Sequence, residues 1–360
     1  MKAVVSKKDL IKGMKLVGSA VAAHSTIPIL GHVKITAEGE KLILTATDLE
    51  VSIVCELPAK DVVAGITTLS ADRFSSVVGA QAGEEISLNV DDQYATSIVS
   101  DTGTFKMLGQ SEADFPKVPD ITGEILVELE ASVLKTALEQ AGYCASSDVT
   151  RHVLNGVFLK CEKEELSIVA TDGKRLAIAK LPGMKEKWEL IVPSKTVTAL
   201  LRSLQDGKVA ISRETNLVIF KFAEIRIVSK LIEGTYPNFE QVMPKTVGEH
   251  IQINREALLS ALKRVSLLTN DKSNSVQLFF SANKLKVSVK TAEVGEAHES
   301  LVIDYKGKDI SVSFSPDYLM EPLRHLVGET VTIGLTDGMS PGIIEDGSAF
   351  RYVLMPMRMN

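Results

Sequence analysis

The sequence is poor in cysteine and in aromatic residues, and it has no excess of positive charge. Its 360 residues include three cysteines and one tryptophan, aromatic residues make up 5%, and the formal net charge is −6. Cys55, Cys144 and Cys161 are odd in number and widely spaced, which argues against a disulfide framework or a zinc site and indicates a reducing, cytoplasmic setting. The acidic balance, taken alone, argues against nucleic-acid binding.

Several kinds of segment and motif are also missing. No apolar run reaches the roughly 18 residues that would cross a bilayer, and the N-terminus lacks the apolar stretch of a secretory signal. The sequence contains neither GxGxxG nor a GxxxxGK motif, and its six histidines show no HxxxH or HExxH spacing. We therefore expect no membrane contact, no metal and no cofactor.

What the sequence does contain is one pattern that occurs three times. Residues 5–17, 129–141 and 253–265 align so that Leu10, Leu134 and Leu258 coincide, each 124 residues from the next. A second pattern recurs in the same order at residues 69–78, 192–201 and 314–323. Repeats of this length are whole domains, which predicts domains at residues 1–120, 121–245 and 246–360.

Each repeat combines amphipathic helices with half-buried strands. In the first helix Leu10, Met14 and Val17 follow one stripe while lysines follow the opposite face, and Ser6 is the expected N-cap. Apolar and polar residues alternate at residues 41–44, 51–57, 86–90, 217–222, 284–289 and 352–355. This alternation predicts antiparallel strands. The fold class is therefore α+β, with two helices and about eight short strands in each domain.

The helix at residues 314–323 contains two prolines with opposite expected effects. Ser315 followed by Pro316 is a typical helix start. Pro322 lacks a backbone N–H, so we expect it to end or kink the helix early.

Two aspartates invite an enzymatic interpretation. Asp48 and Asp172 occupy equivalent places in two repeats, and residues 172–175 read DGKR. The two aspartates could form a carboxylate dyad, or residues 172–175 could form a phosphate site, as in a phosphohydrolase. However, Asp-Gly is also a common turn signal. Equivalent positions in separate domains favour structural turns. Nothing else in the sequence resembles a catalytic constellation.

Basic residues are concentrated on or beside the expected helices although the whole chain is acidic. Such residues are either ordinary solvated helix faces or one positive surface that contacts phosphates rather than bases. A protein scaffold without DNA is a further alternative. The residues are Lys8, Lys12, Lys15, Arg73, Lys135, Lys195, Arg202, Arg255, Lys263, Arg264 and Arg324.

An ordered set of short motifs points to one family. The motifs are TIPILG at residues 26–31, TATDLE at 45–50, VATDGKRL at 169–176 and MPMR at 355–358. With these motifs the chain resembles, from end to end, the bacterial DNA polymerase III beta subunits, the beta sliding clamps. The resemblance implies three clamp domains per subunit and a head-to-tail homodimer that forms a six-domain ring around double-stranded DNA without sequence preference. It also implies a non-catalytic processivity factor.

The resemblance implies a pocket for short Gln-Leu-type peptides. Such peptides belong to the replicative polymerase alpha subunit, the clamp loader, other polymerases and repair proteins. Methionines and aliphatic residues suit an adaptable groove, although the C-terminal methionines could also be core residues. The matching positions are Arg151, Leu154, Thr171, Gly173, Lys174, Arg175, Leu176, Pro237, Val242, Tyr318, Val353, Leu354, Met355, Pro356, Met357 and Arg358.

The resemblance also implies a dimer seam and a DNA-facing set. The seam uses Phe105 and Met107 against Leu267 and Leu268 of the partner subunit, and Arg73 matches a seam cation. The DNA-facing positions are His24, Arg73, Lys195, Arg202, Lys12 and Lys263. The chain departs from the family pattern at His24, His152, Val153, Lys174, Gln241, Ser315 and Pro341.

Overall fold

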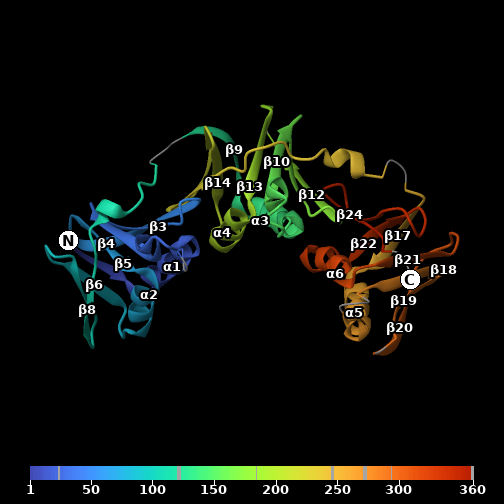
Figure 1. The fold of residues 1–360 in the computed structure, drawn as a ribbon, viewed down its shortest axis with the longest axis horizontal. Coiled ribbons are helices and arrows are strands. Elements are labelled where there is room, and N and C mark those ends of the chain that lie inside the picture. The colour runs from blue at the N-terminus through green and yellow to red at the C-terminus, as the bar shows by residue number, and fades with distance from the viewer. Residues whose placement is uncertain are drawn as a thin grey trace. The chain divides into compact units, whose positions relative to one another are not determined.

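The computed structural model describes residues 1–22, 25–119, 123–183, 185–244, 247–270, 274–292 and 294–357. Figure 1 shows the helices and strands along the chain. By their contacts, the residues form two compact units. The first comprises Met1–Lys135 and Lys195–Leu231, and the second Thr136–Ser194 and Ile232–Asn360. Each unit thus takes part of the middle third of the chain.

The first unit is built on one antiparallel sheet of 12 strands, ordered β8-β7-β6-β1-β4-β16-β15-β14-β9, with β2, β3 and β5 attached through β4. Pairing of β4 with β16 makes this sheet continuous between the first and middle thirds. The strands are β1 (Lys2–Ser6), β2 (His32–Glu38), β3 (Lys41–Thr47), β4 (Val51–Val63), β5 (Gly65–Ser70), β6 (Glu85–Val90), β7 (Ala95–Val99), β8 (Thr104–Leu108), β9 (Glu124–Glu130), β14 (Lys208–Glu214), β15 (Leu217–Phe222) and β16 (Ile225–Lys230).

The second unit has two antiparallel sheets, ordered β13-β10-β11-β12-β24-β23-β22-β17 and β20-β19-β18-β21. Pairing of β12 with β24 joins the middle third to the last. The strands are β10 (Gly156–Glu162), β11 (Glu165–Thr171), β12 (Arg175–Pro182), β13 (Trp188–Pro193), β17 (Glu249–Asn254), β18 (Val276–Ser281), β19 (Lys284–Thr291), β20 (Gly295–Val302), β21 (Ile310–Phe314), β22 (Thr330–Leu335), β23 (Gly342–Asp346) and β24 (Phe350–Leu354).

The α-helices repeat as the sequence predicts. In the described residues they are α1 (Lys7–Val17), α2 (Ala71–Ala80), α3 (Ala131–Ala141), α4 (Ser194–Ser203), α5 (Arg255–Val265) and α6 (Pro316–His325). The first helices of the three repeats, α1, α3 and α5, are each 11 residues long and begin 124 residues apart. With eight strands among the described residues of each third, the α+β prediction is confirmed.

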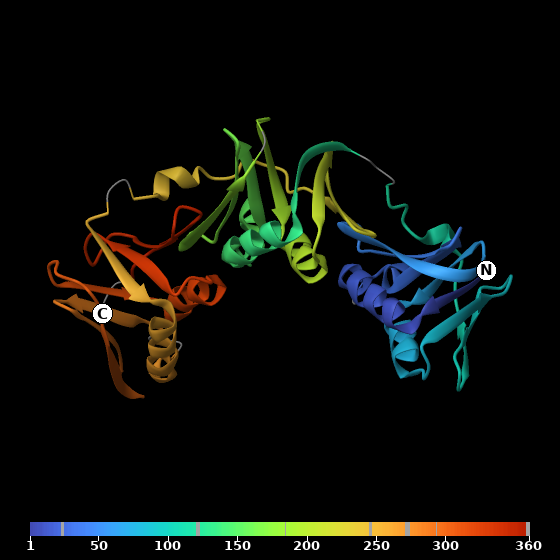
Figure 2. The ribbon, with the colours of Figure 1, turned by 180° about the vertical axis from the view of Figure 1, so that it is seen from behind.

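The helices pack on the sheets through the expected apolar stripes. Leu10, Met14 and Val17 are buried, the hydroxyl of Ser6 accepts from the N–H of Asp9, and α1 lies beside α2 as α5 lies beside α6 (Figures 1 and 2). A Cβ on Gly13 would meet a methyl group of Leu44 at 2.9 Å. The small residue is therefore needed for helix and sheet to approach closely.

The sequence predicted that Pro322 would end or kink its helix early, and the first alternative is wrong, because the helix does not end there. The helix α6 continues to His325, although the proline has no N–H for the carbonyl four residues earlier, that of Tyr318. The hydroxyl of Tyr352, on β24, donates to this carbonyl at 2.8 Å. The helix is thus continuous because the sheet below it satisfies the acceptor that proline leaves open.

We predict that Tyr352→Phe lowers the free energy of unfolding by about 1–2 kcal/mol, because a partly buried carbonyl loses its partner. In a Pro322→Ala background the carbonyl regains a backbone donor, so the same substitution should cost less than half as much. Urea unfolding of the four proteins of this double-mutant cycle measures the coupling. Equal costs in both backgrounds would show that Tyr352 stabilises the protein by some other means.

Candidate functional site

The turn between β11 and β12 is organised by one aspartate. Asp172 Oδ1 accepts the backbone N–H groups of Lys174 and Arg175 at 2.9 and 3.0 Å, and its Oδ2 accepts Arg175 Nε at 3.0 Å. Gly173 has a φ of +85°, which glycine adopts without steric cost. Asp48 does the same in the first unit, where its Oδ1 accepts the N–H groups of Glu50 and Val51. The interpretation of both aspartates as structural turn residues is confirmed.

An apolar cluster lies on the sheet face next to this turn. Its members, from β10, β11, β12, β13, β24 and two loops, are Leu154, Phe158, Val169, Leu176, Ile178, Ile191, Tyr236 and Val353. Leu176 and Val353 are direct cross-strand neighbours, and Tyr236 stacks on Phe158 with ring centroids 4.7 Å apart. The cluster brings together Leu154, Leu176 and Val353, three residues that the sequence assigned to one pocket.

The guanidinium of Arg175 lies on the other face of the sheet, because Arg175 is paired with Leu354 and alternates along β12 with Leu176. It lies 4.4 Å from the ring centroid of Tyr318 and 5.5 Å from that of Tyr143, and its Nη2 donates to the Tyr143 carbonyl. Burial raises the pKa of the Tyr318 hydroxyl, which therefore stays neutral beside the cation. Stacking on aromatic rings and pairing with Asp172 together fix the orientation of Arg175.

Backbone hydrogen bonds hold the C-terminal segment, residues 355–357, to two other parts of the second unit. The N–H of Met355 donates to the carbonyl of Lys174 at 3.0 Å, and that of Met357 to the carbonyl of Ser313 at 2.7 Å. Met355 and Met357 keep exposed fractions of 49% and 40%, so these methionines are not core residues. Exposed, flexible thioethers on an anchored backbone suit an adaptable apolar surface.

Comparison with known proteins identifies the family. Family models of the DNA polymerase III beta subunit match the N-terminal domain at residues 1–119, the central domain at 128–238 and the C-terminal domain at 240–358. The beta sliding clamp of Chlamydia pneumoniae is 32% identical over the full length of both chains. The chain belongs to the DNA polymerase III beta subunit family, the beta sliding clamps.

Solved clamp structures share the whole fold. The sliding clamp of Bartonella birtlesii, solved bound to griselimycin, is 30% identical with a TM-score of 0.93, and that of Bacillus subtilis is 28% identical with a TM-score of 0.94. Both comparisons cover 100% of each chain. Membership in this clamp family confirms the expected non-catalytic processivity subunit and disfavours the phosphohydrolase.

The other residues that the resemblance assigned to the pocket differ in their contacts and exposure. Arg151 Nη1 donates to the carbonyl of Asp172 at 2.8 Å, and Thr171 Oγ1 donates to the carbonyl of Arg175. Pro237 and Val242 are exposed, and they are the sequence neighbours of Tyr236, a member of the cluster, and of Met243, which packs against it. Leu354 is 1% exposed and, by strand alternation, faces away from Val353, so it contributes through its backbone. Arg358 lies outside the described residues.

The expected seam residues include exposed apolar side chains at element edges. Phe105 and Met107 lie on β8, the end strand of its sheet, and Phe105 is 45% exposed. Leu267 and Leu268 follow α5 in a 3-10 turn, and Leu267 is 79% exposed. An edge strand with exposed apolar side chains is open to pairing with another chain.

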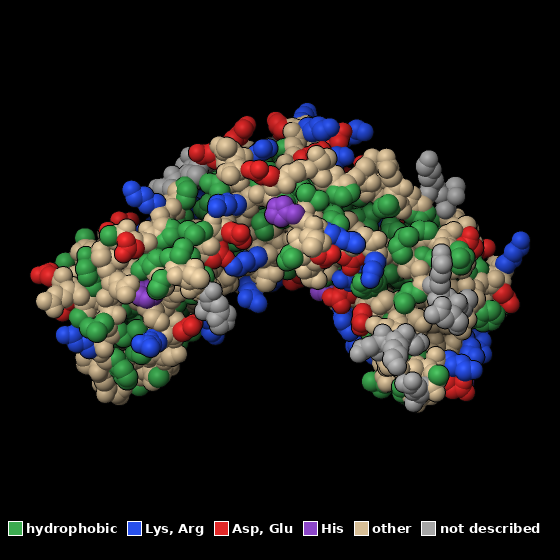
Figure 3. All heavy atoms as spheres, in the orientation of Figure 1, with side chains coloured by type: hydrophobic (Ala, Val, Ile, Leu, Met, Phe, Trp, Pro, Cys, Tyr) green, Lys and Arg blue, Asp and Glu red, His purple; other side chains and the backbone are tan. Residues whose placement is uncertain are grey.

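The expected DNA-facing cations are exposed on the helices of the clamp. Arg73, Lys195, Arg202, Lys12 and Lys263 are all exposed, whereas His24 lies outside the described residues. Lys195 pairs with Asp48 and Lys12 donates to Gln205. On the face seen in Figure 3, Lys and Arg alternate with Asp and Glu.

Arg255 is not a surface cation, unlike the other helix-borne basic residues just named. Its Nε donates to the carbonyl of Gly328 and its Nη1 to that of Leu323, both at 2.8 Å. The guanidinium therefore satisfies carbonyl groups at the C-terminal end of α6.

The described residues offer no metal cluster and no helix able to cross a membrane. No group of three His, Cys, Asp or Glu among them could hold a metal ion, and no described helix has the length and apolarity needed for a membrane span. All three cysteines are buried. Burial raises the pKa of the Cys55 thiol to about 11 and that of Cys144 further, so neither is a ready nucleophile.

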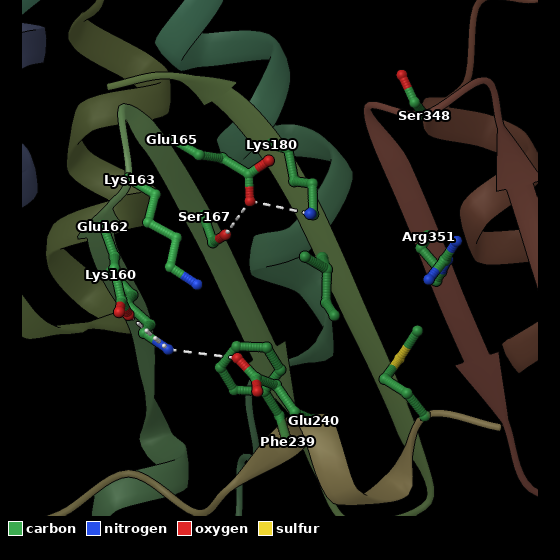
Figure 4. Close-up of a pocket in the computed structure, with 12 residues that line it drawn as sticks. Lys160, Glu162, Lys163, Glu165, Ser167, Lys180, Phe239, Glu240, Ser348 and Arg351 are labelled. Atoms are coloured by element: carbon green, nitrogen blue, oxygen red, sulfur yellow. Dashed lines mark hydrogen bonds and ion pairs between the residues drawn. The ribbon is translucent and has the colours of Figure 1, made fainter. Parts of the chain in front are cut away.

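Sequence reasoning missed a cavity of about 550 Å³ beside the cluster. It is lined by Ile178, Phe239 and Met243 together with charged residues such as Lys180 and Arg351 (Figure 4). Strand alternation could have pointed to it, because Ile178 lies two residues beyond Leu176 on β12 and therefore on the same face.

We predict that Asp172→Ala destabilises the second unit by about 2–4 kcal/mol, because the Arg175 side chain is 15% exposed and would lose its carboxylate. The matched variant Asp48→Ala removes the equivalent turn acceptor, but its partner Lys195 is 49% exposed, so we expect about 1 kcal/mol. Urea unfolding followed by far-UV circular dichroism compares the two. Equal losses would mean that the buried ion pair adds nothing beyond the turn.

Proposed function

We propose that this chain forms a head-to-tail homodimer, a six-domain ring that encircles double-stranded DNA and tethers the replicative polymerase to its template. The observation that carries this proposal is the match of three consecutive clamp models over nearly the whole chain. We place the domain boundaries near residues 120 and 245, in the segments between β8 and β9 and between β16 and β17. The clamp acts in the cytoplasm, where bacterial DNA is replicated.

Ring closure uses the edge of β8 on one protomer and the end of α5 on the other. Phe105, Met107, Leu267 and Leu268 supply apolar contact, and the unpaired backbone groups of β8 supply hydrogen bonds. The same two different surfaces meet at both seams, so the assembly closes as a ring and leaves no free interface.

DNA is held by shallow, unspecific attraction. Lys12, Arg73, Arg202 and Lys263 carry flexible charges on helices, which attract phosphates without reading bases. Lys195 already has a carboxylate partner in Asp48, so its contribution is weaker. Retention comes from the closed ring, whereas tight base contacts would stop sliding.

Partners bind at the apolar cluster of the second unit. A Gln-Leu-type peptide places its apolar side chains on Leu154, Leu176 and Val353, bordered by Val242 and by the exposed methionines Met355 and Met357. The binding of griselimycin by the Bartonella and Pseudomonas aeruginosa clamps supports a ligand site in the family. Modest affinity suffices, because a partner tethered beside a dimer with two pockets has a high effective concentration.

We predict that light scattering gives a mass of twice 39.0 kDa, and that the protein loaded on nicked circular DNA by a clamp loader with ATP escapes once the DNA is linearised. Escape through a free end is the signature of a topological rather than a chemical bond. Leu267→Ala combined with Leu268→Ala should yield monomers and abolish retention. A monomeric wild type, or a complex indifferent to linearisation, would refute the ring.

We predict that Val242→Asp weakens binding of a Gln-Leu-type peptide by about tenfold or more, because a charge would enter an apolar contact surface. Val242 is 54% exposed, so folding should be unaffected. Val327→Asp is the matched control, since Val327 is 86% exposed in the same unit and belongs neither to the cluster nor to the residues packed against it. Fluorescence anisotropy with a labelled peptide measures both. Unchanged affinity in Val242→Asp would remove that residue from the pocket.

A further inference from the structure

The charged cavity beside the apolar cluster continues the same face of the sheet. On β12 and β24 the pair Leu176 and Val353 is followed, two residues along, by the pair Ile178 and Arg351. Residues two apart on a strand share a face and are separated by about 7 Å, and cross-strand neighbours point to the same side. A peptide anchored at Leu176 and Val353 therefore needs only two or three further residues to reach the cavity.

Side chains on this face change in character from row to row. Ile178 lies opposite Val169, and the next row pairs Lys180 with Ser167 and Ser167 with Lys160. The row after that pairs Glu165 with Glu162. The surface thus runs from apolar to basic to acidic with increasing distance from the cluster, and the first charges that a peptide meets are positive.

The cavity is lined by more positive than negative side chains, and each of the negative ones is already in an ion pair. The cations are Lys160, Lys163, Lys180 and Arg351, and the carboxylates are Glu162, Glu165 and Glu240. Lys160 pairs with Glu162 and Glu240, both at 3.3 Å, and Lys180 with Glu165 at 2.9 Å (Figure 4). Lys163 has no ion pair with any residue that the structure describes.

Arg351 keeps most of its binding capacity. Its Nε contacts Glu345 on the adjacent strand at 2.7 Å, which uses one of the five N–H groups of a guanidinium. Its side chain is 53% exposed, and that of Lys180 is 43% exposed. A planar guanidinium fork matches a carboxylate in two hydrogen bonds, and the nearby ammonium of Lys180 adds a further donor.

We propose that this cavity is a second subsite of the partner pocket, and that it takes an acidic residue two or three positions outside the apolar anchor of the bound peptide, with its carboxylate held by Arg351 and Lys180. The inference rests on the proposed function of the apolar cluster. It assigns this clamp a preference among partner peptides that the apolar cluster alone cannot provide, since the cluster does not distinguish flanking charges.

The test compares Gln-Leu-type peptides that share the anchor and differ in the flank. Each peptide carries Asp-Asp, Asn-Asn or Lys-Lys two and three residues outside the anchor, at the N-terminal or at the C-terminal end. For one end, the Asp-Asp peptide should bind about threefold to tenfold more tightly than Asn-Asn at ~0.1 M salt. This advantage should shrink at ~0.5 M salt because the groups are partly exposed.

Variants of the clamp assign the advantage to the cavity. Arg351→Gln and Lys180→Gln should each reduce the ratio of Asp-Asp to Asn-Asn affinity, and Arg351→Glu should invert the preference toward Lys-Lys. The matched control Lys185→Gln, in the same unit and outside the cavity lining, should leave the ratio unchanged.

The outcomes separate this inference from the proposed function. If the Asn-Asn peptides fail to bind the wild type at all, the partner pocket itself is wrong. If they bind but Asp-Asp gives no advantage at either end, or if Lys-Lys gives the same advantage, the acidic subsite is overturned. An advantage that survives both Arg351→Glu and Lys180→Gln would place the carboxylate elsewhere.

Discussion

The pairing of β12 with β24 is the constraint on which the second unit depends. It joins a strand of the middle third to the last strand of the chain, more than 170 residues apart in sequence order. Because the register is fixed, Leu176 meets Val353, the backbone of Met355 reaches Lys174, and the hydroxyl of Tyr352 reaches the carbonyl that Pro322 leaves open. A slip by one residue would turn Val353 away from the cluster and bring Leu354 into its place.

The repeated architecture could be predicted from the sequence because its signals are local and periodic. Helix stripes such as that of Leu10, Met14 and Val17 and alternating strands depend only on spacing, and three copies reinforce each other. Asp48 and Asp172 were interpreted correctly because an aspartate before a turn has a local function, accepting N–H groups two and three residues on.

The features that escaped prediction depend on contacts between distant segments. The continuation of α6 past Pro322 requires a tyrosine hydroxyl from β24, and the partly buried position of Arg255 requires the carbonyl of Leu323 near the end of α6. The cavity next to the cluster requires the register of β12 against β24 and the 3-10 turn that carries Phe239. No spacing rule within a single segment contains this information. The pocket assignment came from the resemblance to the clamps and not from periodicity, and it stays a prediction.

A tether that serves several partners must combine weak, general anchoring with a means of ranking them. In the proposed pocket, the apolar cluster and exposed methionines provide the general part, since dispersion and burial depend little on the exact side chain. A charged group at the edge of such a surface acts differently: it adds little affinity, because it remains partly hydrated, but it discriminates between flanks of opposite sign. Arg351 is held next to Val353 by the same strand, so the distance between anchor and charge is rigid. The order in which partners occupy one pocket can therefore follow from the sign of one or two flanking residues, while the contacts that hold them stay the same.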